Sequence, residues 1–352
     1  MVSKSQTNSP KVSAVIVNWN SVDTTVDCLN SLKEIDYPNC EVIVVDNASP
    51  DDSADVIEKS FPEVTVLRSQ KNLGWGGGTN LGLKHALANE TKYIWLLNND
   101  LVVEPDTLSK LVRVAEKGPD AALVSPVLYF YSTRSKIQHC GSIFDWKGYS
   151  IRHLNNPDET ESVNKQDFWL WCTAILIKRE VVETVGYFDE KYFIYFDDMD
   201  YSARAISIGY HHKLQPTAKV YHRSHSVDLG GLQKAPLHYF YYMTRNEYWF
   251  WKKKVSGLRK FLLIRTYLAS VIRKLAFYKK QAWNDIIDAC LDGLYCSFRG
   301  IGGEWDKSIK MPGILKKLIM WRPYFWVRLF ELNTRRVCDR LLGRKKLTAP
   351  KM

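Results

Sequence analysis

The stretch Val12-Ser13-Ala14-Val15-Ile16-Val17-Asn18-Trp19-Asn20 decides the fold of this 352-residue chain. Its first six residues form a nearly continuous apolar run, which is typical of a strand that helices cover on both faces. A second such run, 41–45, ends at Asp46 and Asn47. Two buried strands this close to the N-terminus predict a sheet inside an α/β domain.

The segments that follow alternate between strand and helix. We expect strands at 12–17, 41–45, 64–67 and 93–97, and helices at 23–32, 56–60, 79–88 and 108–117. This order predicts a mostly parallel sheet flanked by helices. We find no internal repeat.

Polar residues follow three of these strands, as Asn18-Trp19-Asn20, Asp46-Asn47 and Asn98-Asn99-Asp100. Ligands of parallel sheets bind beyond the carboxyl ends of the strands. Strand ends also need Asn and Asp as turn formers, so each cluster alone is weak evidence. Three clusters at one edge indicate a ligand site, where a carboxylate can hold a divalent cation and neutralise a diphosphate.

The segment 72–80 is rich in glycine and precedes an expected helix. Such loops can bind phosphate through backbone N–H groups. This one does not match the P-loop pattern and lacks its lysine, so it is weak evidence for phosphate binding, and a flexible turn is the alternative.

The segment 187–200 places five carboxylates among aromatic residues. Carboxylates in a partly apolar wall can have raised pKa values and act as bases. The alternative is an acidic helix N-terminus on a loop anchored in the core. Downstream, His222 follows a short strand and gains a role as a ligand only if it meets Asp100 in space.

Charge divides the chain unevenly. Residues 251–352 hold 24 Lys and Arg against 7 Asp and Glu, a net charge of +17, whereas residues 1–250 hold 25 against 31, a net charge of −6. We therefore expect a domain over 1–250 and a basic helical domain over 251–352. Its amphipathic stretches, which include 314–342, suit an anionic membrane surface, with solvated bundle helices as the alternative. No stretch is long and apolar enough to span a membrane.

The seven cysteines are scattered, without a CxxC pair, and the first eleven residues are polar. Both features are typical of a reduced chain that lacks a signal peptide. We expect a cytoplasmic protein that is peripheral at the inner face of the plasma membrane.

Taken in order, the motifs Val15-Ile16-Val17-Asn18-Trp19-Asn20, Val44-Val45-Asp46-Asn47-Ala48-Ser49, Asn72-Leu73-Gly74 with Asn80, Leu97-Asn98-Asn99-Asp100, Val185–Asp200, Gly209-Tyr210 and Tyr221-His222 form a recognisable series. Together they resemble the family 2 glycosyltransferases of the GT-A fold, and within them the rhamnosyltransferase-like branch. The resemblance covers residues 11 to about 250 and extends to the pair Arg245-Asn246.

The resemblance implies a role for each matching residue. Asp198 matches the general base that deprotonates the acceptor hydroxyl. Asp100 and His222 match the ligands of Mg²⁺ or Mn²⁺ at the diphosphate. The nucleotide-sugar-binding positions are Asn18, Trp19, Asp46, Asn47, Asn72, Asn80, Asn98 and Asn99, and the acceptor-side positions are Trp169, Trp171, Cys172, Thr173, Asp197 and Asp200.

Three positions depart from the family pattern. Asn98 stands where an aspartate is usual, Asp197 replaces the glutamate before the base, and Cys172 occupies a position where glycine is expected. A thiol there reshapes the acceptor pocket. Trp169 and Trp171 beside it can stack on a sugar, although buried packing is an equal interpretation.

The resemblance implies an inverting, metal-dependent glycosyltransferase that moves L-rhamnose from dTDP-rhamnose to a glycan or polyprenyl-linked acceptor in surface polysaccharide synthesis. Alternatives are a UDP- or GDP-hexose donor and an inactive member that only binds nucleotide sugar. A dinucleotide-dependent oxidoreductase is disfavoured because no GxGxxG follows Val17. A nucleic-acid-binding tail would leave the 187–200 cluster unexplained, so we expect no nucleic-acid partner. A homodimer stays open.

Overall fold

The computed structural model describes residues 9–118, 121–223, 234–321 and 326. The chain divides into two compact units, Met1–Leu232 and Gln233–Met352. The expected boundary after residue 250 falls inside helix α7 (Leu237–Lys253). The division comes earlier because the aromatic residues of α7 pack within the second unit, where Tyr241 stacks on Trp305 with ring centroids 4.6 Å apart.

The first unit has the predicted α/β fold, built around one central sheet. Its strands lie in the order β3-β2-β1-β4-β11-β6-β12-β5, with β7 beside β6. Their bounds are β1 Val12–Asn18, β2 Cys40–Asp46, β3 Thr65–Arg68, β4 Tyr93–Asn98, β5 Leu101–Val103, β6 Leu123–Phe130, β7 Ile137–His139, β11 Ala174–Lys178 and β12 His212–His222.

The first four strands in this order are parallel, and the remaining strands are mixed. β1 pairs in parallel with β2 and β4, and the register sets Asn18 opposite Asp46. Beyond β4, strand β11 is antiparallel to both of its neighbours. The polar strand ends predicted from the sequence therefore share one edge of the parallel half.

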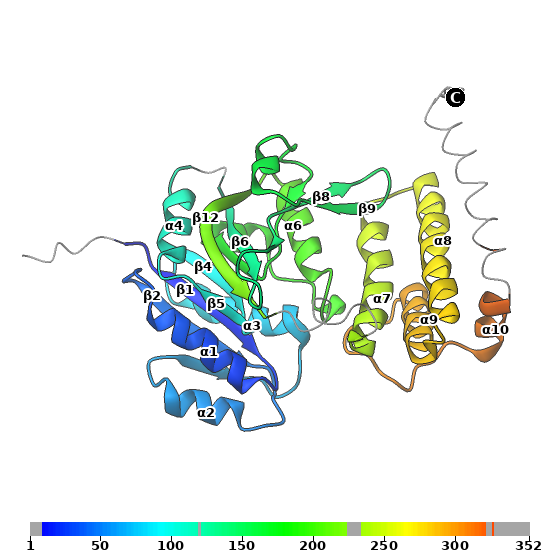
Figure 1. Ribbon diagram of the computed structural model, residues 1–352, viewed down its shortest axis with the longest axis horizontal. Coiled ribbons are helices and arrows are strands. Elements are labelled where there is room, and N and C mark those ends of the chain that lie inside the picture. The colour runs from blue at the N-terminus through cyan, green and yellow to red at the C-terminus, as the bar shows by residue number, and fades with distance from the viewer. Residues whose placement is uncertain (1–8, 119–120, 224–233, 322–325, 327–352) are drawn as a thin grey trace, which may run out of the picture. The chain divides into compact units, whose positions relative to one another are not determined.

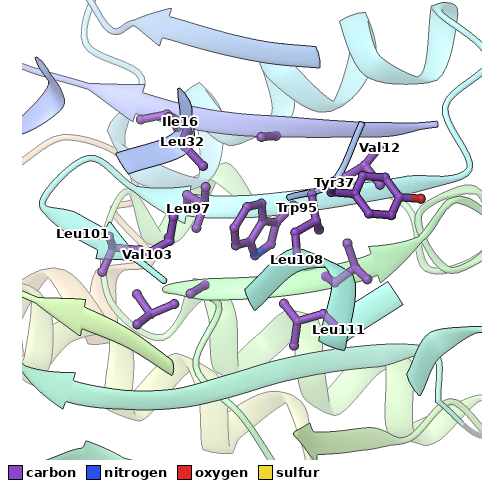
Figure 2. Packing of buried hydrophobic residues seen from close by; sticks show 14 of the residues in the cluster. Val12, Ile16, Leu32, Tyr37, Trp95, Leu97, Leu101, Val103, Leu108 and Leu111 are labelled. Carbon is purple, nitrogen blue, oxygen red and sulfur yellow. The ribbon is translucent and has the colours of Figure 1, made fainter. Parts of the chain in front are cut away.

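Helices cover both faces of this sheet (Figure 1). One face carries α1 Val22–Lys33, α2 Ser53–Ser60 and α4 Thr107–Ala115, and the other carries α3 Gly74–Ala88, α5 Arg179–Val185 and α6 Asp197–Ser207. Figure 2 shows the first of these cores, where Trp95 of β4 lies among aliphatic side chains such as Leu97 and Leu108. Both cores are apolar because the β1, β2 and β4 side chains alternate between two covered faces.

A small antiparallel sheet accompanies the central one. It consists of β8 Ser142–Asp145, β9 Ser150–His153 and β10 Phe168–Trp169, in the order β10-β8-β9. Two short 3₁₀ helices complete the unit, η1 at Pro157–Glu161 and η2 at Glu190–Tyr192. The segment from β10 to β11 connects the two sheets.

The glycine-rich segment differs from the expected loop. Helix α3 begins at Gly74, so Gly76, Gly77 and Gly78 lie inside its first turns. A Cβ on Gly78 would lie 2.7 Å from Cγ1 of Val17, closer than carbon atoms pack. The glycines therefore let the helix backbone approach the sheet.

The second unit is helical, with α7, α8 Leu258–Lys280 and α9 Asn284–Arg299 packed side by side, followed by α10 Gly313–Trp321 (Figure 1). Among the residues that the structure describes, no helix is long and apolar enough to cross a membrane. Of the stretch expected at 314–342, residues 322–325 and 327–342 lie outside the described part. The six described cysteines are free thiols.

Candidate active site

The ends of β1 and β2 form a hydrogen-bonded pair. Nδ2 of Asn18 donates to Oδ1 of Asp46 at 3.1 Å and to Oγ of Ser49, also at 3.1 Å. Oδ1 of Asn18 accepts from Oγ1 of Thr25 at 2.8 Å, and Thr25 accepts in turn from Asn99. This network fixes a buried carboxylate at the edge of the sheet, while Trp19 beside it leaves 49% of its surface exposed.

Asn47 and Asn72 hold the start of α3. The side chain of Asn47 donates to Asn72 at 3.1 Å and to the Gly74 carbonyl at 3.0 Å, and it accepts from the Leu73 amide. Asn72 also accepts from the Gly74 amide at 2.9 Å. The Asn47 side chain and the Oδ1 atom of Asn72 therefore hold the backbone at the start of α3 in place.

Asp100 and His222 meet in space, the condition under which His222 gains a role as a ligand. Nε2 of His222 lies 3.2 Å from Oδ1 of Asp100, and both side chains are largely buried. Strand β12 pairs antiparallel with β5, which sets His222 opposite Leu101 and so beside Asp100. On its other side, Nδ1 of His222 lies 2.9 Å from Oε1 of Gln138 and donates to it.

This arrangement fits a divalent cation. With Nδ1 donating to Gln138, a neutral His222 would turn its Nε2 lone pair toward the Asp100 carboxylate, and these two atoms could then hold a cation between them. Two adjacent ligands of an octahedral ion with bonds of about 2.1 Å lie about 3 Å apart. Among the described residues, no group of three or more His, Cys, Asp or Glu forms a metal site. A cation here would therefore complete its coordination with ligand oxygens and water.

The acidic aromatic segment is an ordered and strained loop that leads into α6. Phe193, Tyr195 and Phe196 have φ angles of 67°, 63° and 66°, which bulky residues rarely adopt. Asn80 of α3 fixes the loop by accepting from the Phe188 amide at 2.9 Å and donating to the Phe188 carbonyl at 3.0 Å. Strain of this kind persists where the surrounding structure imposes it, and it is frequent at functional sites.

Two adjacent carboxylates open α6. Burial raises the pKa of Asp197, and the neighbouring Asp198 carboxylate raises it further. Burial also raises the pKa of Asp198, whereas the backbone N–H groups of Met199 and Cys172 oppose that shift by donating to the carboxylate. Oδ2 of Asp197 is buried without a hydrogen-bond partner. A base with a pKa raised toward neutrality is suited to proton abstraction at physiological pH.

Residues 172 and 173 link Asp198 to the edge of the sheet where β4 ends. The amide of Asn98 donates to the Thr173 carbonyl at 2.9 Å, and Cys172 next to it donates its own amide to Asp198. Burial and the carboxylates of Asp198 and Asp197 raise the pKa of the Cys172 thiol well above its usual range. Cys172 is therefore a neutral thiol beside the base.

The other acceptor-side predictions fall in different places. Asp200 is buried and forms an ion pair with Nε of Arg204 at 2.9 Å, so its carboxylate stabilises the start of α6. Trp169 is 2% exposed and stacks on Phe144, which removes its ring from any ligand. Trp171 is partly exposed and stacks on a buried His139 at 4.0 Å. Of the two tryptophans, Trp171 alone is partly exposed, and it also packs against the core and meets His153 at right angles.

Sequence reasoning missed two residues that organise the site. Gln138 lies on β7, a strand that the sequence did not indicate, so no motif singled it out. Trp75 lies within the glycine-rich segment, and its Nε1 donates to Oδ1 of Asn98 at 3.1 Å. Its position between glycines that must approach the sheet was the available signal.

The parallel half-sheet, its polar edge, and the carboxylates at the start of α6 define a class, the GT-A glycosyltransferases. The model of the family described as glycosyl transferase family 2 matches residues 13–186. The fold of TarS 1-349 of S. aureus in complex with UDP matches with a TM-score of 0.53 at 15% identity, covering 97% of this chain and 94% of that one. GalNAc-T7 with UDP, GalNAc and Mn²⁺ matches with a TM-score of 0.53 at 18% identity, covering 68% and 48%.

Curated relatives agree with this class. The dTDP-rhamnosyl transferase RfbF of Shigella flexneri is 28% identical over 303 residues, which span 82% of this chain and 96% of the relative. An N-acetylglucosaminyl-diphospho-decaprenol L-rhamnosyltransferase of Mycobacterium tuberculosis (strain H37Rv) is 25% identical over 258 residues, 64% of this chain and 84% of the relative. Residues 13–186 are a glycosyl transferase family 2 domain, and the chain is a glycosyltransferase similar to rhamnosyltransferases.

Proposed function

We propose that this glycosyltransferase transfers L-rhamnose from dTDP-rhamnose, with inversion and with a divalent cation, to a glycan or polyprenyl-linked acceptor. The observation that supports this reaction type is the link, through residues 172–173, between Asp198 and the end of β4, where we place the nucleotide sugar. The donor sugar and the lipid-linked acceptor come from the relatives named for those activities.

The chain's own residues supply each step of the proposed transfer. The edge formed by Asn18 and Asp46 binds the nucleoside, and Asp100 with His222 would hold Mg²⁺ or Mn²⁺. The cation, when bound, neutralises charge on the departing diphosphate. Asp198 accepts the proton of the acceptor hydroxyl while that oxygen bonds to the anomeric carbon, and the bond from that carbon to the diphosphate oxygen breaks in line.

The acceptor side is narrow in this proposal. Cys172 places a buried thiol where a glycine would leave space, and the partly exposed Trp171 is the aromatic side chain that could contact a sugar ring. A UDP- or GDP-hexose remains the second candidate donor. It is favoured only by the folds of TarS and GalNAc-T7, whose structures hold UDP.

We further propose that the second unit contacts an anionic membrane surface. Helix α10 exposes Ile314, Leu318 and Trp321 by 79%, 52% and 69% of their surfaces. These residues recur at helical spacing, and Lys316 and Lys317 lie between them. Apolar side chains interleaved with lysines suit the headgroup region of a membrane that holds the polyprenyl-linked acceptor.

Release of nucleoside diphosphate from dTDP-, UDP- and GDP-sugars tests the reaction, with a polyprenyl-linked acceptor and with Mg²⁺, Mn²⁺ or EDTA. We expect turnover with dTDP-rhamnose that EDTA abolishes. Asp198→Asn should lower kcat by about 10²- to 10⁴-fold while leaving nucleotide affinity intact, because only proton transfer is lost. Asp189→Asn is the matched control, since asparagine keeps the cap that Asp189 provides to η2. Wild-type turnover by Asp198→Asn would refute the assignment of the base.

A further inference from the structure

Asn98 stands where the family pattern has an aspartate, and its orientation is fixed by a neighbour. The indole N–H of Trp75 is a donor only, so the atom that it contacts 3.1 Å away must be the amide oxygen of Asn98. The backbone amide of Asn98 is also fixed, because it donates to the Thr173 carbonyl at 2.9 Å. With Oδ1 engaged by Trp75, Nδ2 of Asn98 is left to donate elsewhere.

Trp75 itself is held from two sides. Its backbone amide donates to the Phe193 carbonyl at 2.7 Å. Its ring meets Phe188 edge to face, with centroids 5.2 Å apart, and Phe188 stacks on Tyr201 of α6. The preceding Gly74 has φ +72°, and a Cβ there would collide with the backbone of Phe193. Trp75 therefore connects the end of β4 to the loop that carries the base.

We infer that Trp75 is a positioning residue that locks the Asn98 amide, so that Nδ2 donates a hydrogen bond to the nucleotide sugar. The ligand atom is an acceptor oxygen, either on the transferred sugar or on the diphosphate. An asparagine at this edge then replaces a charged metal ligand with a neutral donor. This inference rests on the proposed function, because it needs a nucleotide sugar at the edge of the sheet.

The test is a double-mutant cycle read out as binding affinity by calorimetry. Trp75→Phe keeps an aromatic ring, smaller than the indole, and removes the N–H, so the Asn98 amide can rotate. We expect affinity for dTDP-rhamnose to fall about five- to tenfold, the size of one hydrogen bond. In an Asn98→Ala background no amide is left to orient, so Trp75→Phe should change affinity less than twofold. Equal losses in both backgrounds would overturn the inference.

Two further variants sharpen the cycle. Asn98→Asp keeps an acceptor for the indole but replaces the Nδ2 donor with an oxygen, so we expect weaker binding, and tighter binding would overturn the inference. Trp95→Phe is the matched control. Trp95 lies on β4, the strand that ends at Asn98, and its side chain is within the core (Figure 2). Its Nε1 is buried without a partner. Trp95→Phe should lower the melting temperature without changing the affinity for dTDP-rhamnose.

The same titrations with dTDP alone separate the two sources of the acceptor oxygen. A loss seen for both ligands assigns the oxygen to the diphosphate, and a loss confined to dTDP-rhamnose assigns it to the sugar. If the wild-type chain binds dTDP-rhamnose but gives no product, the proposed transfer fails while the cycle still decides on Trp75. If the wild-type chain binds no nucleotide sugar, both proposals fall.

Discussion

At the residue scale, the carboxylate pair that opens α6 binds protons more tightly in the folded chain than in the unfolded chain. Burial raises both pKa values, to about 8 for Asp197 and about 6 for Asp198, from the usual value of 3.8. This pair therefore holds more protons in the folded state than in the unfolded state between about pH 4 and pH 8. Its contribution to the free energy of unfolding falls as pH rises through this window.

We predict that Asp197→Asn removes much of this pH dependence. The variant has no charge to desolvate, so it should be more stable than the wild type at pH 8 by about 1–3 kcal/mol, and similar to it near pH 4, below which the unfolded chain is protonated too. Urea denaturation at the two pH values measures the difference. Asp189→Asn, at the other end of the same loop, should leave the slope unchanged, and a parallel loss of slope there would contradict the explanation.

The carboxylate pair also sets the low-pH limb of the profile of kcat/KM against pH. Asp198 must be ionised to accept a proton, so we expect kcat/KM to fall as pH drops through about 6. The two groups interact, and the profile reports the pair rather than one residue. Asp197 has a pKa of about 8 and is still protonated near pH 6, so Asp197→Asn should leave the limb in place. A limb that moves to lower pH in this variant would show that a charge on Asp197 acts on the base.

Gln138 makes a second prediction at this scale. By accepting from Nδ1 of His222, it directs Nε2 toward Asp100. Gln138→Leu should weaken Mn²⁺ binding in the presence of dTDP by about 10- to 100-fold, as losses of such supporting contacts do. Manganese binding followed by electron paramagnetic resonance measures this without turnover. Gln215→Leu, on the same strand as His222, is the control and should bind Mn²⁺ as the wild type does.

At the scale of elements, the close approach of α3 to the sheet depends on its glycines. A Cβ on Gly82 would overlap the Val15 side chain of β1. Alanine favours helices over glycine by about 1 kcal/mol, but the overlap costs more, so Gly82→Ala should destabilise the fold by about 1–3 kcal/mol. Chemical denaturation measures it. Gly313→Ala in α10, where the space is open, should be neutral or stabilising, and an equal loss there would point away from packing.

The same helix shows where sequence reasoning succeeds and where it stops. The periodic runs predicted β1, β2 and β4 and their flanking helices, because buried parallel strands carry a strong local signal. The glycine-rich segment was predicted to be a loop, but its glycines from Gly74 onward belong to α3. The prediction failed because close helix–sheet contact is a tertiary property that no local pattern contains. The clusters that hold Asn18 and Asp46 were predicted to share one edge of the sheet, and the parallel register sets these two residues opposite each other. Gln138 was missed because its role depends on the pairing of β6 with β7.

At the scale of the whole molecule, charge and exposed apolar surface coincide in one part of the chain. Residues 251–352 carry a net charge of +17, and the apolar residues that α10 exposes lie among lysines. If this surface meets lipid, binding needs both apolar insertion and anionic headgroups. If it meets RNA instead, removing exposed apolar side chains should matter little, since phosphate contacts dominate such binding.

The double variant Ile314→Ser/Trp321→Ser separates these readings in the full chain. We expect sedimentation with vesicles of phosphatidylcholine and phosphatidylglycerol to weaken by about tenfold or more, because two largely exposed apolar side chains no longer enter the bilayer. Vesicles of phosphatidylcholine alone should bind the wild type weakly, since the lysines then lack a counter-charge. Ile208→Ser removes a similarly exposed apolar residue after α6, in the first unit, and should bind as the wild type does. Salt-sensitive binding to RNA that the double variant retains, together with no binding to anionic vesicles, would replace the membrane by nucleic acid as the partner.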